Sequence, residues 1–163
     1  MNRLLACFAS SVLLIASPFA ASAAGSASRA SQRSCPSGAA AQEIPRVVKA
    51  FFAALAKDDD GEERRLTTPD FYAYDIGKRF TGPELSRLVA DAHRAGRAIE
   101  WNIGAVDLRV DCNLAFAAWE NVGASGTAAK MEPRSWLESA LLVRRDGRWL
   151  IHFLHSTPKD PRG

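Results

Sequence analysis

An Asp-Gly dipeptide, Asp146-Gly147, lies between two apolar runs near the end of the chain, residues 138–145 and 148–156. Asp-Gly between such runs is a strong signal for a two-residue β-hairpin turn, and the turn fixes the register of the two strands. Counted outward from the turn, that register pairs Arg145 with Arg148, Arg144 with Trp149, Leu142 with Ile151, Ala140 with Phe153 and Glu138 with His155. Both faces of the hairpin are largely apolar, which predicts a sheet that is covered on both sides.

The 163 residues are enough for one domain with its own core. A basic start, an apolar run over residues 4–16 and the small residues Ala21-Ser22-Ala23 predict a secretory signal peptide over residues 1–23. A buried N-terminal helix is the alternative. The apolar run is too short to span a bilayer well, so we expect a periplasmic or secreted protein without stable membrane association after cleavage.

Signal-peptide cleavage would remove Cys7 and leave Cys35 and Cys112. An even number of cysteines in an exported protein suggests a disulfide between them, and two free or buried thiols are the alternative. Neither cysteine has the spacing of a metal-ligand motif, and we predict no metal site. Basic residues are scattered rather than interleaved with aromatic residues, so we expect no nucleic-acid partner.

Residues 24–43 are rich in Ala, Ser and Gly, and we interpret them as a flexible segment before a folded domain over residues 44–158 and a tail over residues 159–163. Pro45 is typical of a first helical turn, and the apolar spacing that follows predicts a helix. Other patterns predict a short helix over 62–66, a strand over 71–75, a helix over 83–95, strands over 99–110 and 114–122, a loop over 123–133 and the closing hairpin. This order predicts the α+β class, with one bent sheet and the helices packed on a single face.

This order resembles the nuclear-transport-factor-2-like superfamily, which contains ketosteroid isomerase, SnoaL-like cyclases and the association domain of calcium/calmodulin-dependent kinase II. The residues that are similar to the end of the kinase association domain are Glu138-Ser139, Arg144-Arg145-Asp146-Gly147, Trp149-Leu150 and His155. Residues 70–83 are similar to the front half of SnoaL-like sequences. The resemblance implies a cone-shaped fold: a curved mixed or antiparallel sheet wraps around three helices from the N-terminal half and leaves a pocket on its concave face. It also implies a homo-oligomer that pairs through the sheet, with a dimer favoured.

Two positions of the expected pocket depart from the kinase association domain, in which arginines project inward from the last two hairpins. The matching positions here are Ala140 and, near the preceding strand, Asn121. This favours a more neutral and aromatic pocket, whose candidate ligand-binding residues are Tyr72, Tyr74, Trp101, Trp119, Asn121 and Phe153. The tryptophans are also typical core residues, and the facing of Trp101 and Trp119 stays open because the loop between their strands has no decisive turn type.

Three residues are candidates for acid–base chemistry. Glu138 opposite His155 would place a carboxylate beside an imidazole, an arrangement that raises the pKa of the imidazole and prepares a general base or acid. The alternative is a cross-strand ion pair without a catalytic role. Asp75 closes an aromatic strand near Tyr72 and Tyr74, where it could act as a base as in ketosteroid isomerase or cap the turn at Gly77.

These features leave three functional hypotheses. The first is an exported protein that binds a small, mostly apolar molecule in its pocket and oligomerises through its sheet. The second is a cofactor-independent isomerase, cyclase or dehydratase that uses Asp75 or His155 as acid or base. The third is an assembly module without a ligand. No cofactor is expected under any of them, and the fold does not choose among them.

Overall fold

The computed structural model describes residues 37–159, which belong to one compact unit. The predicted signal peptide, Cys35 and the tail beyond Lys159 lie outside the described residues. The helices are α1 (Ser37–Leu55), α2 (Asp60–Leu66) and α3 (Gly82–Arg94). The strands are β1 (Thr67–Asp75), β2 (Lys78–Thr81), β3 (Arg97–Glu100), β4 (Ile103–Asp111), β5 (Leu114–Thr127), β6 (Lys130–Arg145) and β7 (Arg148–Pro158).

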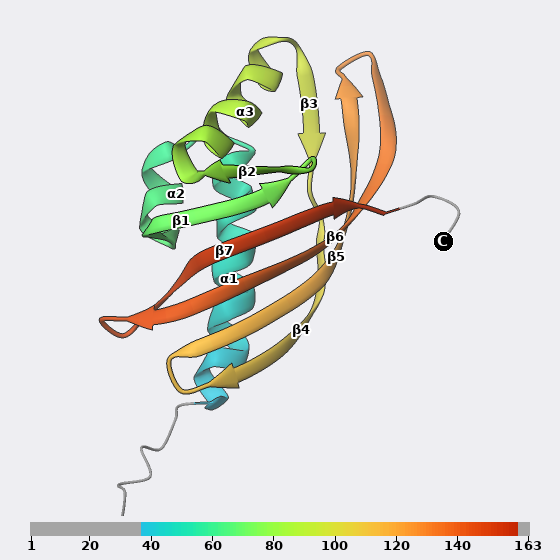
Figure 1. The fold of residues 1–163 in the computed structure, drawn as a ribbon. Helices are drawn as coiled ribbons and strands as arrows, with labels where there is room; N and C mark the ends of the chain where they lie inside the picture. Colours follow the sequence, from blue (N-terminus) through green and yellow to red (C-terminus); the bar gives the residue numbers. More distant parts are fainter. Residues whose placement is uncertain (1–36, 160–163) are drawn as a thin grey trace, which may run out of the picture. The chain divides into compact units, whose positions relative to one another are not determined.

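The strands form one strongly curved, seven-stranded mixed sheet in the order β2-β1-β7-β6-β5-β3, and β4 also pairs with β5. Strands β1 and β7 run parallel, and the other pairs are antiparallel. Helix α1 crosses one face of this sheet, while α2 and α3 lie beside β1 and β2 (Figure 1). The predicted α+β class, with a curved sheet around three helices, is confirmed.

The core forms between α1 and the inner face of the sheet. Phe51 and Phe52 of α1 are buried there, as the apolar spacing predicts, and Phe52 packs against the ring of Trp119 on β5. Ala117 and Ala140 are paired on β5 and β6 and are fully buried, so the helix can approach the sheet closely. Burying each phenylalanine contributes about 1.5–3 kcal/mol.

Helix α1 begins at Ser37, so Pro45 lies inside the helix and not in its first turn. The predicted start was wrong. Ala39, Ala40 and Ala41 are strong helix formers, but the Ala-rich composition around them is also typical of a flexible segment. Burial of Ala40 and Ile44 against the core stabilises this additional length of helix. The tertiary contacts offset the cost of the hydrogen bond that Pro45 does not donate.

Helix α3 begins and ends close to its predicted bounds. Thr81 and Glu84 form a capping box at the N-terminus, and the Glu84 carboxylate accepts hydrogen bonds from the Thr81 backbone N–H and hydroxyl at 2.8 Å. Gly96 follows the helix with φ +76°, a conformation that glycine adopts without steric cost. The capping box at the N-terminus and Gly96 after the C-terminus are therefore the sequence signals that predict the two ends of α3.

The closing hairpin keeps the predicted register only from the turn to the pair Leu142–Ile151. A β-bulge then inserts His152, after which Leu141 pairs with Phe153, Ala140 with Leu154, Ser139 with His155 and Glu138 with Ser156. The predicted pairs Ala140–Phe153 and Glu138–His155 are therefore wrong. The additional residue sends Leu154 into the core in place of Phe153 and turns His155 to the outer face.

Three further expectations differ from the structure. The predicted loop over 123–133 is instead strand, because β5 and β6 continue to a turn between Thr127 and Lys130. The predicted strand over 99–110 is divided into β3 and β4, and β2 pairs with β1 where only a turn was expected. Glycine and serine made residues 123–126 resemble a loop, but glycine is needed there because the backbone of β3 passes very close to Gly123.

Candidate functional site

A buried carboxyl group, Glu138 of β6, lies on the inner face of the sheet with its side chain surrounded by neutral hydrogen-bond donors. Trp119 Nε1 donates to Glu138 Oε2 at 2.6 Å, and Asn121 Nδ2 donates to the same oxygen at 3.0 Å. Ser156 Oγ donates to Glu138 Oε1 at 3.1 Å. Glu138 is only 5% exposed and forms no ion pair with the residues that the structure describes. We call these four residues the Glu138 network.

Burial raises the pKa of Glu138 from its ordinary value of 4.5 to about 7. Hydrogen bonds from Asn121, Trp119 and Ser156 lower the pKa and offset part of that effect, while the negative charge of Asp75 raises it further. Glu138 thus exchanges a proton near neutral pH, which is the property required of a general acid or base.

Asn121 fixes the geometry of the Glu138 network. Its Oδ1 accepts a hydrogen bond from the backbone N–H of Asn102 at 2.9 Å, while its Nδ2 donates to Glu138. Both ends of the amide are therefore used, and its orientation is determined. Trp119 packs against Phe52 with ring centroids 6.1 Å apart, so the two donors to Glu138 Oε2 are held by the core. This settles the facing of Trp119, which points inward.

Asp75 ends β1 on the same face as Phe71 and Ala73, because alternate residues of a strand share a face. Burial raises the pKa of Asp75, while the hydrogen bond from the Ile76 N–H and the charge of His155 lower it. That N–H lies 2.8 Å from Asp75 Oδ1, so the carboxylate does stabilise the turn, as one of the two predicted roles requires. The same side chain lies near Glu138 and stays partly exposed.

His155 lies on the outer face of the sheet and is not the partner of Glu138. Its ring stacks on Phe153 at 6.5 Å and meets the edge of Tyr74 at 6.3 Å. Tyr72 joins these rings, with its centroid 5.0 Å from that of Phe153, and Arg79 lies 4.4 Å above the Tyr72 ring. Tyr72, Tyr74, Phe153 and His155 form an outer aromatic cluster.

The structure thus divides the predicted site residues into two groups. Trp101, Trp119 and Asn121 lie on the inner side with Glu138, and Trp101 packs against Phe52 at 5.7 Å. Tyr72, Tyr74 and Phe153 belong to the outer aromatic cluster. The sequence did not indicate Ser156 as a member of the Glu138 network, because a bulge brings it into position. It did not indicate the contact of Asn102 with Asn121 either, because a backbone N–H makes that contact.

A hollow at the end of the sheet brings Asp75 together with residues of the outer aromatic cluster. It has a volume of about 470 Å³ and is lined by residues 74–79, at the turn between β1 and β2, and residues 155–158, at the end of β7. We call it the strand-end hollow. Tyr74, Asp75 and His155 all line it. Ser156 lines it as well and donates to Glu138, so it connects the hollow to the buried carboxyl group.

Within residues 37–159, no group of three or more His, Cys, Asp or Glu side chains is arranged to hold a metal ion. In the same part of the chain, no helix is both long and apolar enough to cross a membrane. Cys112 is disulfide-bonded. Its predicted partner, Cys35, lies outside the described residues, so the pairing stays a prediction.

Comparison with solved structures identifies the fold. A protein of unknown function from Mycobacterium tuberculosis superposes with a TM-score of 0.64 at 19% identity, over 72% of this chain and 70% of that one. A candidate dehydratase of the NTF2-like family from Streptomyces avermitilis superposes with a TM-score of 0.64 at 16% identity, over 75% and 97% of the two chains. The chain has the nuclear-transport-factor-2-like (NTF2-like) fold.

A ketosteroid isomerase-like protein from Erwinia carotovora atroseptica shares the NTF2-like fold, with a TM-score of 0.62 at 17% identity over 76% of this chain and 99% of that one. No family model matches the sequence, and no curated protein matches it closely enough to count as a relative. The described activities of proteins with this NTF2-like fold differ, so the fold by itself assigns none of them.

Proposed function

We propose that the protein binds a small, mostly apolar molecule in the strand-end hollow. The proposal is carried by one observation: a partly buried carboxyl group, Asp75, lines the hollow together with the rings of Tyr74 and His155. Rings that can pack against an apolar body, beside one polar group that can orient it, are the typical chemistry of a small-molecule site. The ligand would place its apolar part on the rings and a hydrogen-bond donor on Asp75.

We further propose that the protein acts in the periplasm or outside the cell. The sequence of residues 1–23 supports this location, because it has the pattern of a signal peptide. The disulfide of Cys112 supports it independently, since disulfides persist mainly in oxidising compartments.

Replacement of Asp75 by asparagine tests the binding site. We expect 2-naphthol, which carries a hydroxyl donor, to bind the wild-type protein at least about tenfold more tightly than 2-methoxynaphthalene, because a hydrogen bond to a carboxylate contributes about 1.5–3 kcal/mol. Asp75→Asn should remove most of this preference, as measured by isothermal titration calorimetry. The control Asp107→Asn changes an exposed carboxylate on β4 and should leave the preference intact. Equal binding of both compounds by the wild-type protein would contradict the proposal.

A second candidate function is acid–base catalysis by an isomerase or dehydratase. It is favoured by the proximity of Asp75 to Glu138, two carboxyl groups whose pKa values are both raised by burial. Two solved structures with the same fold, described as ketosteroid isomerase-like and as a candidate dehydratase, are consistent with such chemistry. Asp75 would accept a proton from carbon, and Glu138 would hold or return a proton through Ser156.

The same Asp75→Asn variant separates binding from catalysis. Hydrogen–deuterium exchange at the carbon beside the carbonyl of 2-indanone, followed by NMR, should be accelerated by the wild-type protein and should fall about 100-fold or more in the variant. If the wild-type protein binds 2-naphthol but does not accelerate this exchange, the catalytic candidate fails and the binding proposal stands.

We also propose that two copies pair through the outer face of β5 and β6. Four large apolar side chains are about half exposed there, at 46–53%, and lie on the face opposite Trp119 and Glu138: Leu114, Phe116, Val122 and Leu137. We call them the outer apolar patch. Exposed apolar side chains on one face of a sheet are typical of an interface, and the same face of a second copy provides a complementary apolar surface for a two-fold pair.

The substitution Leu137→Arg tests this pairing. We expect the wild-type protein to have twice the mass of one chain in light scattering, and Leu137→Arg to have the mass of one chain, because the interface would bury an unpaired charge. The control Ile76→Arg places arginine at an equally exposed apolar residue, 57% against 53%, outside the patch, and should keep the wild-type mass. A wild-type mass of one chain would contradict the proposal.

A further inference from the structure

A second and larger hollow is lined by residues of α2, α3 and the first part of β1. It has a volume of about 950 Å³, close to the upper end of the range of about 300–1,000 Å³ typical of small-molecule sites. Its walls come from α2, the first part of β1 and α3, so we call it the α2–α3 hollow. Apart from Arg79, it shares no lining residue with the strand-end hollow.

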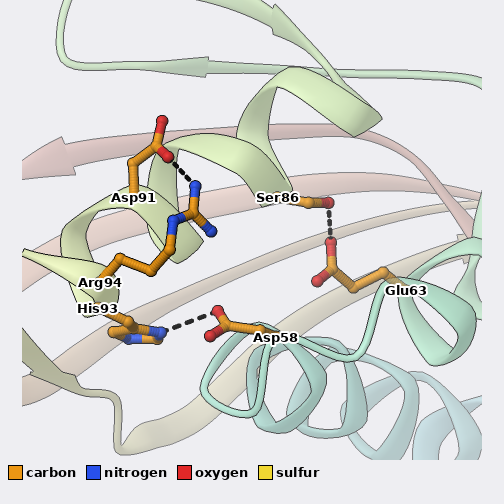
Figure 2. A network of polar contacts seen from close by, with 6 residues as sticks. All are labelled: Asp58, Glu63, Ser86, Asp91, His93 and Arg94. Carbon is orange, nitrogen blue, oxygen red and sulfur yellow. Dashed lines mark hydrogen bonds and ion pairs between the residues drawn. The ribbon is translucent and has the colours of Figure 1, made fainter.

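Polar contacts between the helices hold the walls of this hollow in place. Ser86 of α3 donates a hydrogen bond to the carboxylate of Glu63 on α2, which is only 6% exposed. At the other end of α3, His93 lies 2.8 Å from a carboxylate oxygen of Asp58. Figure 2 shows both contacts, each directed from α3 toward the segment that contains α2. The α2–α3 hollow is therefore built from fixed elements.

The lining of the hollow contains more arginines than carboxyl groups, and two of these arginines form no ion pair within the described residues. Four arginines line it, against three carboxyl groups. Arg94 is paired with Asp91, but neither Arg64 nor Arg87 forms an ion pair with any residue between 37 and 159. Both are exposed, from α2 and α3 respectively, so their guanidinium groups are available to a ligand.

The carboxyl groups of the hollow do not cancel this charge. Glu63 accepts a hydrogen bond from Ser86, and burial raises the pKa of its carboxyl group and favours the neutral form. Asp70 lies 3.5 Å from His152 and 4.0 Å from Arg145, which are its own basic neighbours on the hairpin. Asp60 is the remaining carboxyl group in the lining. Outside the lining, Glu84 lies close enough to Arg87 and Arg79 for their charges to lower its pKa.

Part of the wall of the hollow is apolar. Phe51 and Phe71 form part of its wall and are nearly completely buried, with ring centroids 5.6 Å apart. Pro69, Pro83 and Ala90 extend this apolar surface toward the arginines. A matching occupant has an apolar body and one anionic group, because a guanidinium group binds a carboxylate through two parallel hydrogen bonds.

We propose that the α2–α3 hollow is a second ligand site, which binds a small organic anion with an apolar body through Arg64 and Arg87. This site is independent of the strand-end hollow and of the function proposed for it. Its ligand differs in charge from the one expected there, since Asp75 would repel an anion.

The probe is 4-phenylbutyrate, compared with its neutral amide, 4-phenylbutyramide, by isothermal titration calorimetry at neutral pH and low ionic strength. We expect the wild-type protein to bind the carboxylate at least about tenfold more tightly than the amide. The double variant Arg64→Gln/Arg87→Gln should bind the two compounds about equally. The control Arg109→Gln/Arg148→Gln removes the same charge from exposed positions on β4 and β7 and should keep the preference.

The location of binding provides a second measurement. In amide NMR spectra, 4-phenylbutyrate should shift the signals of Glu63, Ser86 and Arg87 and leave those of His155 and Ser156 unchanged. Shifts confined to His155 and Ser156, an equal loss in the control variant, or no preference for the carboxylate in the wild-type protein would each overturn the proposal. None of these results would affect the binding of 2-naphthol near Asp75.

Discussion

Raising the pH from 4.5 to about 7 should destabilise the protein by about 3 kcal/mol through Glu138 alone, because its pKa rises over this interval on folding. Between these values the folded state holds a proton on Glu138 that the unfolded state has already released. Stability falls with pH wherever the folded state binds more protons. The contribution of Glu138 is complete below the unfolded pKa and is lost as the pH rises through the folded pKa.

The variant Glu138→Gln isolates this contribution. The glutamine oxygen can accept from Trp119 and Asn121, and its amide can donate to Ser156, so the network of hydrogen bonds is kept without a titrating group. We expect the stability of the variant, measured by urea unfolding at a series of pH values, to fall about 3 kcal/mol less than that of the wild-type protein over the same interval.

The difference between variant and wild type is the informative quantity, because Glu63 and Asp75 also have raised pKa values and contribute slopes of the same sign. The control Asp107→Asn, at an exposed position, should reproduce the wild-type profile. A profile of Glu138→Gln that is parallel to the wild-type profile would show that Glu138 does not hold its proton on folding, and it would remove the basis for the catalytic candidate.

Replacing Gly123 by alanine should destabilise the protein by about 2–4 kcal/mol, which is a large effect for the addition of one methyl group. A Cβ at this position would lie 1.8 Å from the carbonyl oxygen of Glu100, which is backbone and has no flexible side chain to move away. The residue after Gly123 pairs with Glu100 in the ladder between β3 and β5. The substitution would therefore separate β3 from the sheet.

Thermal unfolding of Gly123→Ala and of Gly38→Ala measures this effect. Gly38 lies in α1, and a Cβ there would meet nothing within 4 Å, so alanine should leave the stability unchanged or raise it by up to about 1 kcal/mol. Equal melting temperatures for Gly123→Ala and the wild-type protein would contradict the close approach of the two backbones.

Local chemistry made much of the fold predictable. The Asp-Gly turn, the capping box of α3 and the apolar stripe of α1 each depend on residues that are near one another in the sequence. They were sufficient for the α+β class, the position of the closing hairpin turn and the resemblance to the NTF2-like superfamily, although β2 was missed and β3 and β4 were predicted as one strand. The start of α1 and the strands over 123–133 were missed, because composition rich in Ala, Gly and Ser is shared by loops, helices and closely packed strands.

The candidate site was predictable in its residues but not in its contacts. Glu138, Asp75, Trp119 and Asn121 were all chosen from the sequence, and the structure brings them together on the inner side of the sheet. The role assigned to Glu138 depended on a hairpin without a bulge. The bulge at His152 shifts the register, so Glu138 pairs with Ser156 and not with His155. Glu138 therefore lies among neutral donors and not beside an imidazole, and burial raises its pKa, whereas a protonated imidazole would lower it.

The sequence by itself determined most of the segments of this protein that become helix or strand and where its final hairpin turns, because those choices depend on neighbours a few residues away. Only the tertiary structure decided which side chains face inward beyond the bulge. His152 reaches Thr68 at 3.1 Å and Asp70 at 3.5 Å across the parallel pair of β1 and β7, and those residues are far from it in the sequence. A bulge at this position has no local sequence signal, and one additional residue moves every later side chain to the other face of the strand.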